Sequence, residues 1–115
     1  MNERDLNTAL LEAFPELTAE FEEYTSWQDG MDTGAFLTYE DVFRPHVEKA
    51  VEQKDVFFAE RAFAFIEKLF LSGDGYAVNV VTVGILEGLK ANCNNELVRP
   101  YLKDATRREF DELMY

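Results

Sequence analysis

Apolar residues recur along most of this chain at the three- and four-residue spacing of an amphipathic helix. In residues 2–14, one face of such a helix carries four apolar side chains, those of Leu6, Leu10, Ala13 and Phe14. The same spacing predicts further helices, over residues 15–24, 38–53, 56–71, 76–89, 96–102 and 105–114. Glycines at positions 30 and 34 and the segment 72–75 mark breaks between them.

Two of these helices have predicted starts. Thr38 and Asp41 have the spacing of a capping box, in which a hydroxyl and an acid three residues later satisfy the first backbone N–H groups. Asp55 is placed to cap the next helix. Pro45 falls within the second turn of the helix over residues 38–53, so that helix is expected to begin later or to bend there.

The segment over residues 76–89 is compatible with two structures. Its β-branched residues, preceded by Asp-Gly, suit a β-hairpin. Its apolar side chains also form a helical face, at Val78, Thr82, Ile85, Leu86 and Leu89. We predict a buried helix, because the other elements are helical and an isolated hairpin is only marginally stable.

These elements predict an all-α fold, a compact bundle of about six to seven helices in antiparallel helix-turn-helix pairs. Stacking of the pairs like a short α-solenoid is a second arrangement that the pattern allows. A length of 115 residues and a 47% hydrophobic composition suit a single helical domain over residues 1–115 with its own core.

Cysteine content and the N-terminal residues favour the cytoplasm. Cys93 is the one cysteine, which excludes an intramolecular disulfide. The N-terminal segment carries acids and lacks the apolar run of a secretory signal. No stretch approaches the roughly 20 apolar residues of a membrane span. We therefore expect a cytoplasmic protein without a membrane partner.

The net charge of −12 is concentrated in the first half of the chain. Residues 1–60 hold fifteen acids and four bases, whereas residues 61–115 hold eight acids and seven bases. Such a surface repels nucleic acid and anionic membranes, so neither is expected as a partner. A partner with a basic surface is favoured, and the plain alternative is that the charge serves solubility.

Asp29 begins a twelve-residue stretch that partly matches a calcium-binding loop. Asp29, Gly34 and Glu40 stand at positions one, six and twelve, between predicted helices. Met31 and Thr33 stand at positions three and five, where acidic or amide oxygen ligands are expected. The missing acid at position three removes a charged ligand, so we expect no metal here.

The chain carries no complete catalytic motif. His46 is the one histidine, so a site with two histidine ligands is excluded within one chain. His46 and Glu48 point to different faces of a helix, and Cys93 lies in a polar loop without a neighbouring cation to activate it. We expect a non-enzymatic protein without a cofactor.

Acidic and aromatic residues are interspersed over residues 20–32. At protein interfaces, rings supply anchoring and carboxylates supply steering and register. We therefore predict a partner-binding surface made of six residues, namely Glu20, Glu23, Tyr24, Trp27, Asp29 and Asp32. The alternative is that Trp27 belongs to the core and that the glutamates form a solvated helix face.

Four segments of the chain resemble a small bacterial family of uncharacterised all-helical domains. They read FPEL (14–17), RPHVEKAVEQKD (44–55), FAFIEKLFLSGDGYAVNVVTVGILEGL (63–89) and YLKDATRREFDEL (101–113). These are packing motifs, and together they cover most of the chain. Related small proteins are often encoded by stand-alone genes, some beside polymorphic or contact-dependent toxins, where they look like immunity proteins.

These features predict an immunity protein that binds a cognate bacterial toxin and covers its basic active-site or substrate-binding surface. The small size, the acidic half with embedded aromatics and the lack of a complete active site motivate this hypothesis. The alternatives are a helical adaptor that binds another protein and, behind it, a calcium-responsive helix-loop-helix domain. A hydrolase built around His46 comes last.

Overall fold

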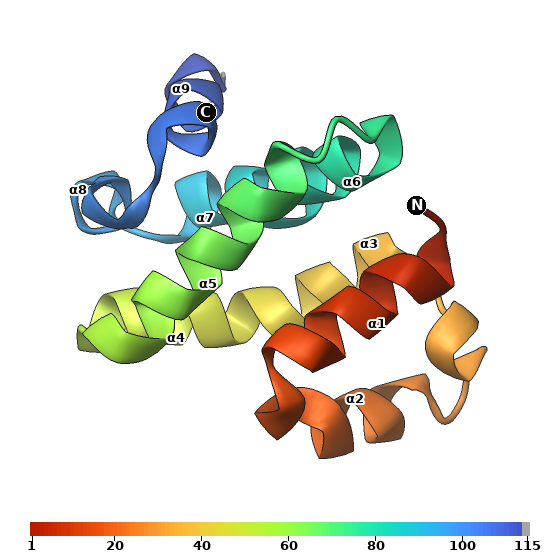
Figure 1. Cartoon of the computed structure of the whole chain (residues 1–115). Helices are drawn as coiled ribbons and strands as arrows, with labels where there is room; N and C mark the ends of the chain where they lie inside the picture. The colour runs from red at the N-terminus through yellow and green to blue at the C-terminus, as the bar shows by residue number, and fades with distance from the viewer. Residues whose placement is uncertain (114–115) are drawn as a thin grey trace.

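The computed structural model describes residues 1–113, and every regular element in that range is helical (Figure 1). The first half contains α1 (Glu3–Ala13), a 3-10 turn (Pro15–Leu17), α2 (Thr18–Thr25), a second 3-10 turn (Gly30–Asp32), α3 (Ala35–Thr38), a π-helical turn (Tyr39–Phe43) and α4 (Arg44–Gln53). The second half contains α5 (Val56–Phe70), α6 (Gly75–Asn79), a π-helical turn (Val80–Leu86), α7 (Glu87–Asn92), α8 (Asn95–Val98), a 3-10 turn (Arg99–Tyr101) and α9 (Asp104–Glu112). Each π-helical turn joins its two neighbours into one long helix, α3–α4 and α6–α7.

The all-α prediction is confirmed, and the segment over residues 76–89 is helical. As a helix, that segment sends its large apolar side chains into the core, at Val80, Val81, Ile85, Leu86 and Leu89. The start of the chain lies against α6, where the Tyr76 hydroxyl donates to the Glu3 carboxylate. The helices therefore close into a bundle and do not extend as an open stack of pairs. Met114, the predicted end of the last helix, lies outside the described residues.

Aromatic rings fill the centre of the bundle. The ring centroids of Phe14, Phe43 and Phe65 lie 5.0 to 5.8 Å apart, in the tilted and edge-on arrangements that aromatic pairs prefer. Tyr39 stacks on Phe65, and its buried hydroxyl donates to the carbonyl of Leu6 at 2.6 Å. Burial raises the pKa of Tyr39, so the phenol stays protonated and serves as a donor. These rings hold the α1 region, the long helix α3–α4 and α5 together.

The long helix α3–α4 begins at Ala35, three residues before the predicted start at Thr38. The Ala35 N–H donates to the carboxylate of Glu3 on α1, so a side chain from another helix caps it. The Thr38 hydroxyl lies inside the helix and donates to Asn7. The prediction of a Thr38–Asp41 capping box is therefore wrong, because a tertiary contact supplies the cap earlier in the chain.

The π-helical turn over Tyr39–Phe43 accommodates Pro45. A proline inside an α-helix removes one backbone hydrogen bond and clashes with the preceding turn. Here the Arg44 N–H donates to the carbonyl of Tyr39, five residues back, so the helix widens just before the proline. The helix therefore runs through Pro45 with a wider turn, where the sequence predicted a later start or a bend.

Arg44 connects the two long helices beside their π-helical turns. Its Nη1 donates to the carbonyl of Gly84 at 3.4 Å. Gly88 makes room for this side chain, because a Cβ atom there would lie 2.1 Å from the Arg44 guanidinium. A glycine four residues after Gly84 thus lets a largely buried cation lie between α4 and α7.

Side-chain carboxylates cap other helices as well. Asp55 accepts from the Phe58 N–H at the start of α5, as predicted. Glu67 of α5 accepts from the backbone N–H groups of Ala105 and Thr106 and thereby caps α9 from outside. The Thr106 hydroxyl also donates to Glu67, at 2.7 Å. A carboxylate at this position also complements the positive end of the helix dipole, so Glu67 anchors α9 to α5.

Asn7 of α1 is a fully buried polar residue whose side chain makes three hydrogen bonds. Its nitrogen donates to the carbonyls of Met31 and Thr33, at 2.9 and 2.8 Å. Its oxygen accepts from the Thr38 hydroxyl at 2.6 Å. One amide therefore holds both the loop before α3 and the start of the long helix against α1.

Replacing Asn7→Ala is expected to lower the free energy of unfolding by roughly 3 kcal/mol, because the carbonyls of Met31 and Thr33 lose their hydrogen bonds from Asn7 and the Thr38 hydroxyl loses one of its two acceptors. Urea unfolding followed by circular dichroism measures this loss. Asn79→Ala, at an exposed position of α6, is the matched control and should change stability by no more than about 0.5 kcal/mol. Equal losses for the two variants would contradict the role given to Asn7.

Replacing Glu67→Gln is expected to destabilise the fold by about 1 kcal/mol at neutral pH, the usual contribution of a helix cap. Burial opposes ionisation of Glu67, but the hydrogen bonds from Thr106 and Ala105 outweigh it and hold its pKa below the ordinary value. Because the folded-state pKa is lowered, the stabilisation is present above the unfolded pKa of about 4.3 and is lost as pH falls through the folded-state pKa.

The stability difference between wild type and Glu67→Gln should therefore shrink as unfolding is measured from about pH 6 down to pH 3. Glu12→Gln, which removes an exposed carboxylate from α1, is the control. A difference for Glu67→Gln that stays constant with pH would rule out the ionised cap.

Candidate functional site

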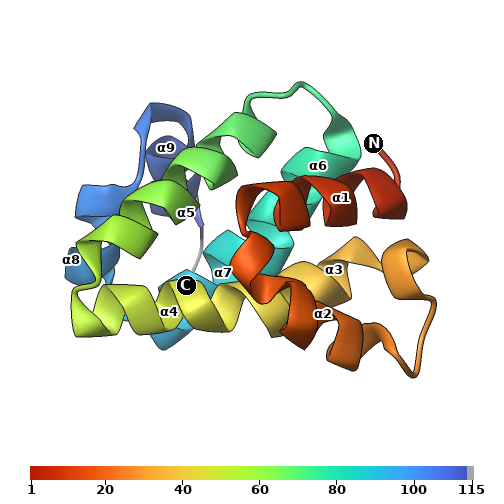
Figure 2. The same ribbon diagram turned by 60° about the horizontal axis from the view of Figure 1, so that its bottom comes forward.

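Four of the six predicted site residues line one groove. The groove has a volume of about 470 Å³, and α2 and the π-helical turn of the long helix α3–α4 form its walls. Its lining residues, which define what we call the acidic groove, are Glu20, Glu23, Tyr24, Trp27, Asp41 and Val42. Figure 2 shows α2 beside the long helix, so both walls come from the acidic half of the chain.

The orientation of α2 explains why these residues meet. Leu17 and Phe21 are buried and hold this segment on the core. Glu20, Glu23 and Tyr24 are three and four residues apart, so they share the helix face next to the long helix. The helix ends at Thr25, and Trp27 follows in the turn. The amphipathic pattern of α2 thus places two acids and a phenol on one wall.

Trp27 is 93% exposed, the highest value for a large hydrophobic side chain in residues 1–113. The alternative that Trp27 belongs to the core is therefore wrong. Leaving a side chain of this size in water forgoes roughly 2 kcal/mol of burial free energy. The fold gains little from this tryptophan, and its ring is free to be covered by another molecule.

Asp41 and Val42 complete the acidic groove, although neither was predicted as a site residue. The Tyr24 hydroxyl donates to Asp41 at 2.5 Å. Burial and this hydrogen bond raise the pKa of Tyr24, so the phenol stays protonated and orients the carboxylate. Val42 is buried beneath. The direction of both side chains depends on the π-helical turn that contains them, and the bend or later start predicted from Pro45 does not specify that turn.

His46 of α4 stands at the edge of the acidic groove, where its Nε2 lies 3.0 and 3.2 Å from the two carboxylate oxygens of Glu20. One helical turn earlier, Glu16 is held by two nitrogens of Arg61, at 2.7 and 3.2 Å. The hydrogen bond to Arg61 lowers the pKa of Glu16. Each of these neighbouring glutamates therefore has a partner on another helix, which offsets their mutual repulsion.

The carboxylate of Glu23 makes no ion pair or hydrogen bond with any other residue in the described chain. Glu22 beside it is also exposed but does not line the acidic groove. The acidic groove therefore offers one unpaired carboxylate at Glu23, next to those that contact His46 and Tyr24. Glu22 and Glu23 form a natural matched pair for substitution.

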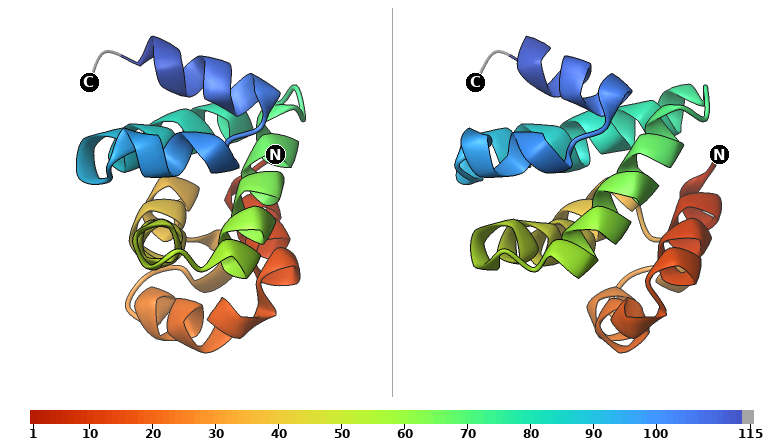
Figure 3. Two further views of the ribbon diagram at one scale, coloured as in Figure 1. Left: turned by 90° about the vertical axis from the view of Figure 1, so that its left-hand side faces the viewer. Right: turned by 60° about the vertical axis from the view of Figure 1, so that its left-hand side comes forward.

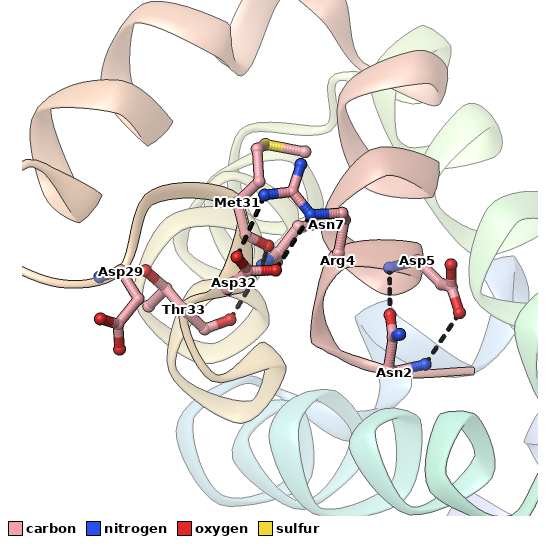
Figure 4. Close-up of polar contacts among 8 residues, drawn as sticks. All are labelled: Asn2, Arg4, Asp5, Asn7, Asp29, Met31, Asp32 and Thr33. Carbon is pink, nitrogen blue, oxygen red and sulfur yellow. Dashed lines mark hydrogen bonds and ion pairs between the residues drawn. The ribbon is translucent and has the colours of Figure 1, made fainter.

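The other two predicted site residues, Asp29 and Asp32, lie in the loop beyond α2 and do not line the acidic groove (Figure 4). Arg4 of α1 binds both carboxylate oxygens of Asp32, each at 3.0 Å, and this contact lowers the pKa of Asp32. The Asp29 carboxylate points away from the pair in Figure 4. The six predicted residues therefore do not form one surface. Four of them line the acidic groove, whereas Asp32 is paired with Arg4 from α1.

The loop that resembled a calcium site is a connection tied to α1. The carbonyls of Met31 and Thr33 accept from Asn7, and Glu40 lies 3.5 Å from the guanidinium of Arg44. Within residues 1–113, no three Asp, Glu, His or Cys side chains are grouped so that they could hold a metal ion. The carbonyls of Met31 and Thr33 and the Glu40 carboxylate thus have partners inside the protein.

Cys93 and His46 lie on different elements, Cys93 directly after α7 and His46 within α4. His46 contacts Glu20, whereas Cys93 lies 4.0 Å from the carboxylate of Glu52. Burial, followed by the charges of Glu48 and Glu52, raises the pKa of Cys93 to about 11. The thiol is therefore protonated at neutral pH and is a weak nucleophile.

The basic residues near the C-terminus lie far from the acidic groove. Figure 3 shows α9 and α2 at opposite ends of the bundle. Arg99 is paired with Asp111 through two hydrogen bonds of 3.0 and 2.9 Å, and Lys103 with Glu60 at 3.1 Å.

No helix in residues 1–113 has the length and apolar character needed to cross a membrane.

The chain belongs to the family described as Domain of unknown function (DUF7674), whose model matches residues 7–115. The resemblance to a family of uncharacterised domains is thereby confirmed, while a link to toxin immunity stays a prediction. The match spans every residue of the acidic groove. No curated protein and no solved structure matches the chain.

The exposure and surroundings of Trp27 predict how its fluorescence is quenched. Neutral acrylamide should quench the native and the urea-unfolded protein with similar constants, because Trp27 is already exposed and is the one tryptophan of the chain. Caesium should quench native Trp27 more strongly than iodide, because nearby carboxylates attract cations and repel anions. Strong protection from acrylamide in the native state would contradict the exposed position.

Proposed function

We propose that this chain is a non-enzymatic binding protein whose acidic groove holds a basic segment of a partner protein. In the specific form of the proposal, the partner is a cognate bacterial toxin, and the chain is an immunity protein that covers the toxin's basic active-site or substrate-binding surface. The observation that carries the proposal is the 93% exposed Trp27 at the edge of a groove lined by three carboxylates.

The exposed ring supports an anchoring role. Tryptophan is among the residues that contribute most to protein interfaces, because one side chain buries a large apolar area at low entropic cost. A tryptophan face also attracts the cation of an arginine or lysine. Trp27 and Tyr24 at the acidic groove therefore suit a guest that is partly apolar and positively charged.

The carboxylates of the acidic groove suit the attraction of a basic partner and the fixing of its position in the groove. Glu20, Glu23 and Asp41 lie on two facing walls, so a bound cation is approached from both sides. The first half of the chain adds a wider negative field, which speeds association with a basic protein. The same field disfavours nucleic acid as the partner.

The immunity role is supported by the small size of the chain and by its resemblance to families in which some members accompany toxins. An immunity protein needs surface complementarity and no chemistry of its own. The protonated Cys93 and the engaged His46 fit such a protein. A helical adaptor shares the same surface requirement and differs in the identity of its partner.

Trp27→Ala is expected to weaken binding of a cognate toxin, sought among the domains encoded next to this chain, by roughly 2 kcal/mol, about thirtyfold in Kd. The matched control is Phe57→Ala, which removes another exposed aromatic that does not line the acidic groove. Titration calorimetry with an inactivated toxin gives the Kd, and survival on co-expression with active toxin gives the biological effect.

Charge reversal tests the same groove by a second route. Glu23→Lys should abolish protection, whereas Glu22→Lys, its neighbour outside the acidic groove, should protect like wild type. Equal protection by both variants would keep immunity and move the interface elsewhere. Absence of protection by the wild-type protein would exclude the immunity role for that toxin and leave the adaptor role.

A further inference from the structure

Arg61 shows how this protein binds a guanidinium inside its own fold. Two nitrogens of Arg61 face the two oxygens of Glu16, and the guanidinium carbon lies 4.9 Å from the centroid of the Phe14 ring. A carboxylate edge and an aromatic face together hold the planar cation. Arginine prefers this combination because its nitrogens form a fixed fork and its plane stacks on rings.

Glu20 repeats the first part of this arrangement one helical turn later. Its two carboxylate oxygens face a planar nitrogen group at 3.0 and 3.2 Å, but that group is the imidazole of His46. The aromatic part is present in the acidic groove as Trp27 and Tyr24. A side chain from the protein itself therefore stands where a guest cation would pair with Glu20.

His46 also has space beside it. A second hollow, of about 240 Å³, lies next to its ring, with Lys49, Gln53, Asp55 and Phe58 among the lining residues. The ring is about one-third exposed, so it can turn without disturbing the core. Glu20 and Glu16 face the imidazole from the α2 side, whereas Asp55 and Lys49 face it from the hollow.

We propose that the acidic groove is an arginine site and that His46 holds the place of the arginine on Glu20 in the free protein. The inference rests on the proposed function, because it assumes that a basic segment enters the acidic groove. On binding, the guest guanidinium takes both oxygens of Glu20 and stacks on Trp27, with Glu23 as a second counter-charge. The imidazole turns into the hollow, so His46 sets the affinity and selectivity of the acidic groove.

This competition has a measurable consequence. When a side chain of the protein occupies the site for part of the time, a guest can bind only to the fraction of molecules in which the site is free. The apparent affinity for the guest is reduced by that fraction. His46→Ala should therefore bind a basic guest about threefold to tenfold more tightly than wild type. His46→Arg should bind it more weakly, because a permanent guanidinium would remain on Glu20.

The probe is an N-acetylated tetra-arginine amide, titrated into the full chain while the emission of its one tryptophan, Trp27, is followed. We expect wild type to bind, His46→Ala to bind more tightly and His46→Arg more weakly. The tetra-lysine peptide should bind at least threefold more weakly than tetra-arginine. The ring protons of the one histidine should shift in nuclear magnetic resonance spectra as wild type saturates.

A second pair of variants separates local competition from a general charge effect. In a Glu20→Gln background, His46→Ala should change the affinity by less than about 1.5-fold, because the contested carboxylate is gone. An equal gain in both backgrounds would overturn the proposal. So would equal binding by wild type and His46→Ala, and in that case the proposed function would survive. If the tetra-arginine peptide bound none of the variants, the proposed function would fail as well.

Discussion

The start of the long helix α3–α4 is set by two polar side chains on α1. The buried amide of Asn7 holds the carbonyls of the preceding loop and the hydroxyl of Thr38. Glu3 accepts the first free N–H of the helix, at Ala35. Because buried polar groups require partners, this arrangement has few alternatives of similar energy. It fixes the rotation of the helix about its axis and hence the wall that Asp41 contributes to the acidic groove.

Helical periodicity was sufficient to predict the fold class, because each apolar stripe is a local property of the sequence. It identified the helical segments, but over residues 76–89 it left a β-hairpin open, and the helix there was predicted because the other elements are helical and an isolated hairpin is marginally stable. Local pattern failed at the start of the long helix, where Glu3 supplies a cap from 32 residues away. The π-helical turn was missed because its position depends on packing against a second long helix as well as on Pro45.

The candidate site was predicted in part for the same reason. Glu20, Glu23, Tyr24 and Trp27 are close in sequence, so helix geometry brings most of them together. Asp32 was assigned to the same surface, but Arg4 meets it from α1. The role of Asp41 arises from a contact 17 residues away, with Tyr24. An acidic stretch that looks uniform in the sequence is therefore divided by folding into carboxylates with internal partners and a smaller set that faces the solvent.

The two π-helical turns lie against each other in the middle of the bundle. A π-helical turn holds one residue more than the α-helical turn it replaces, so the extra residue is accommodated locally while the helix on either side keeps its direction. Deleting one residue from Tyr39–Phe43 would therefore restore regular α-helix, with the parts before and after it in nearly the same relative rotation, and would change mainly the directions of the side chains inside the turn. His46 and Arg44, which follow the turn, would keep their contacts with Glu20 and Gly84, whereas the wall made by Asp41 and Val42 would change. Relatives that lack one residue in this segment should therefore keep the helices in place and lose this wall of the acidic groove.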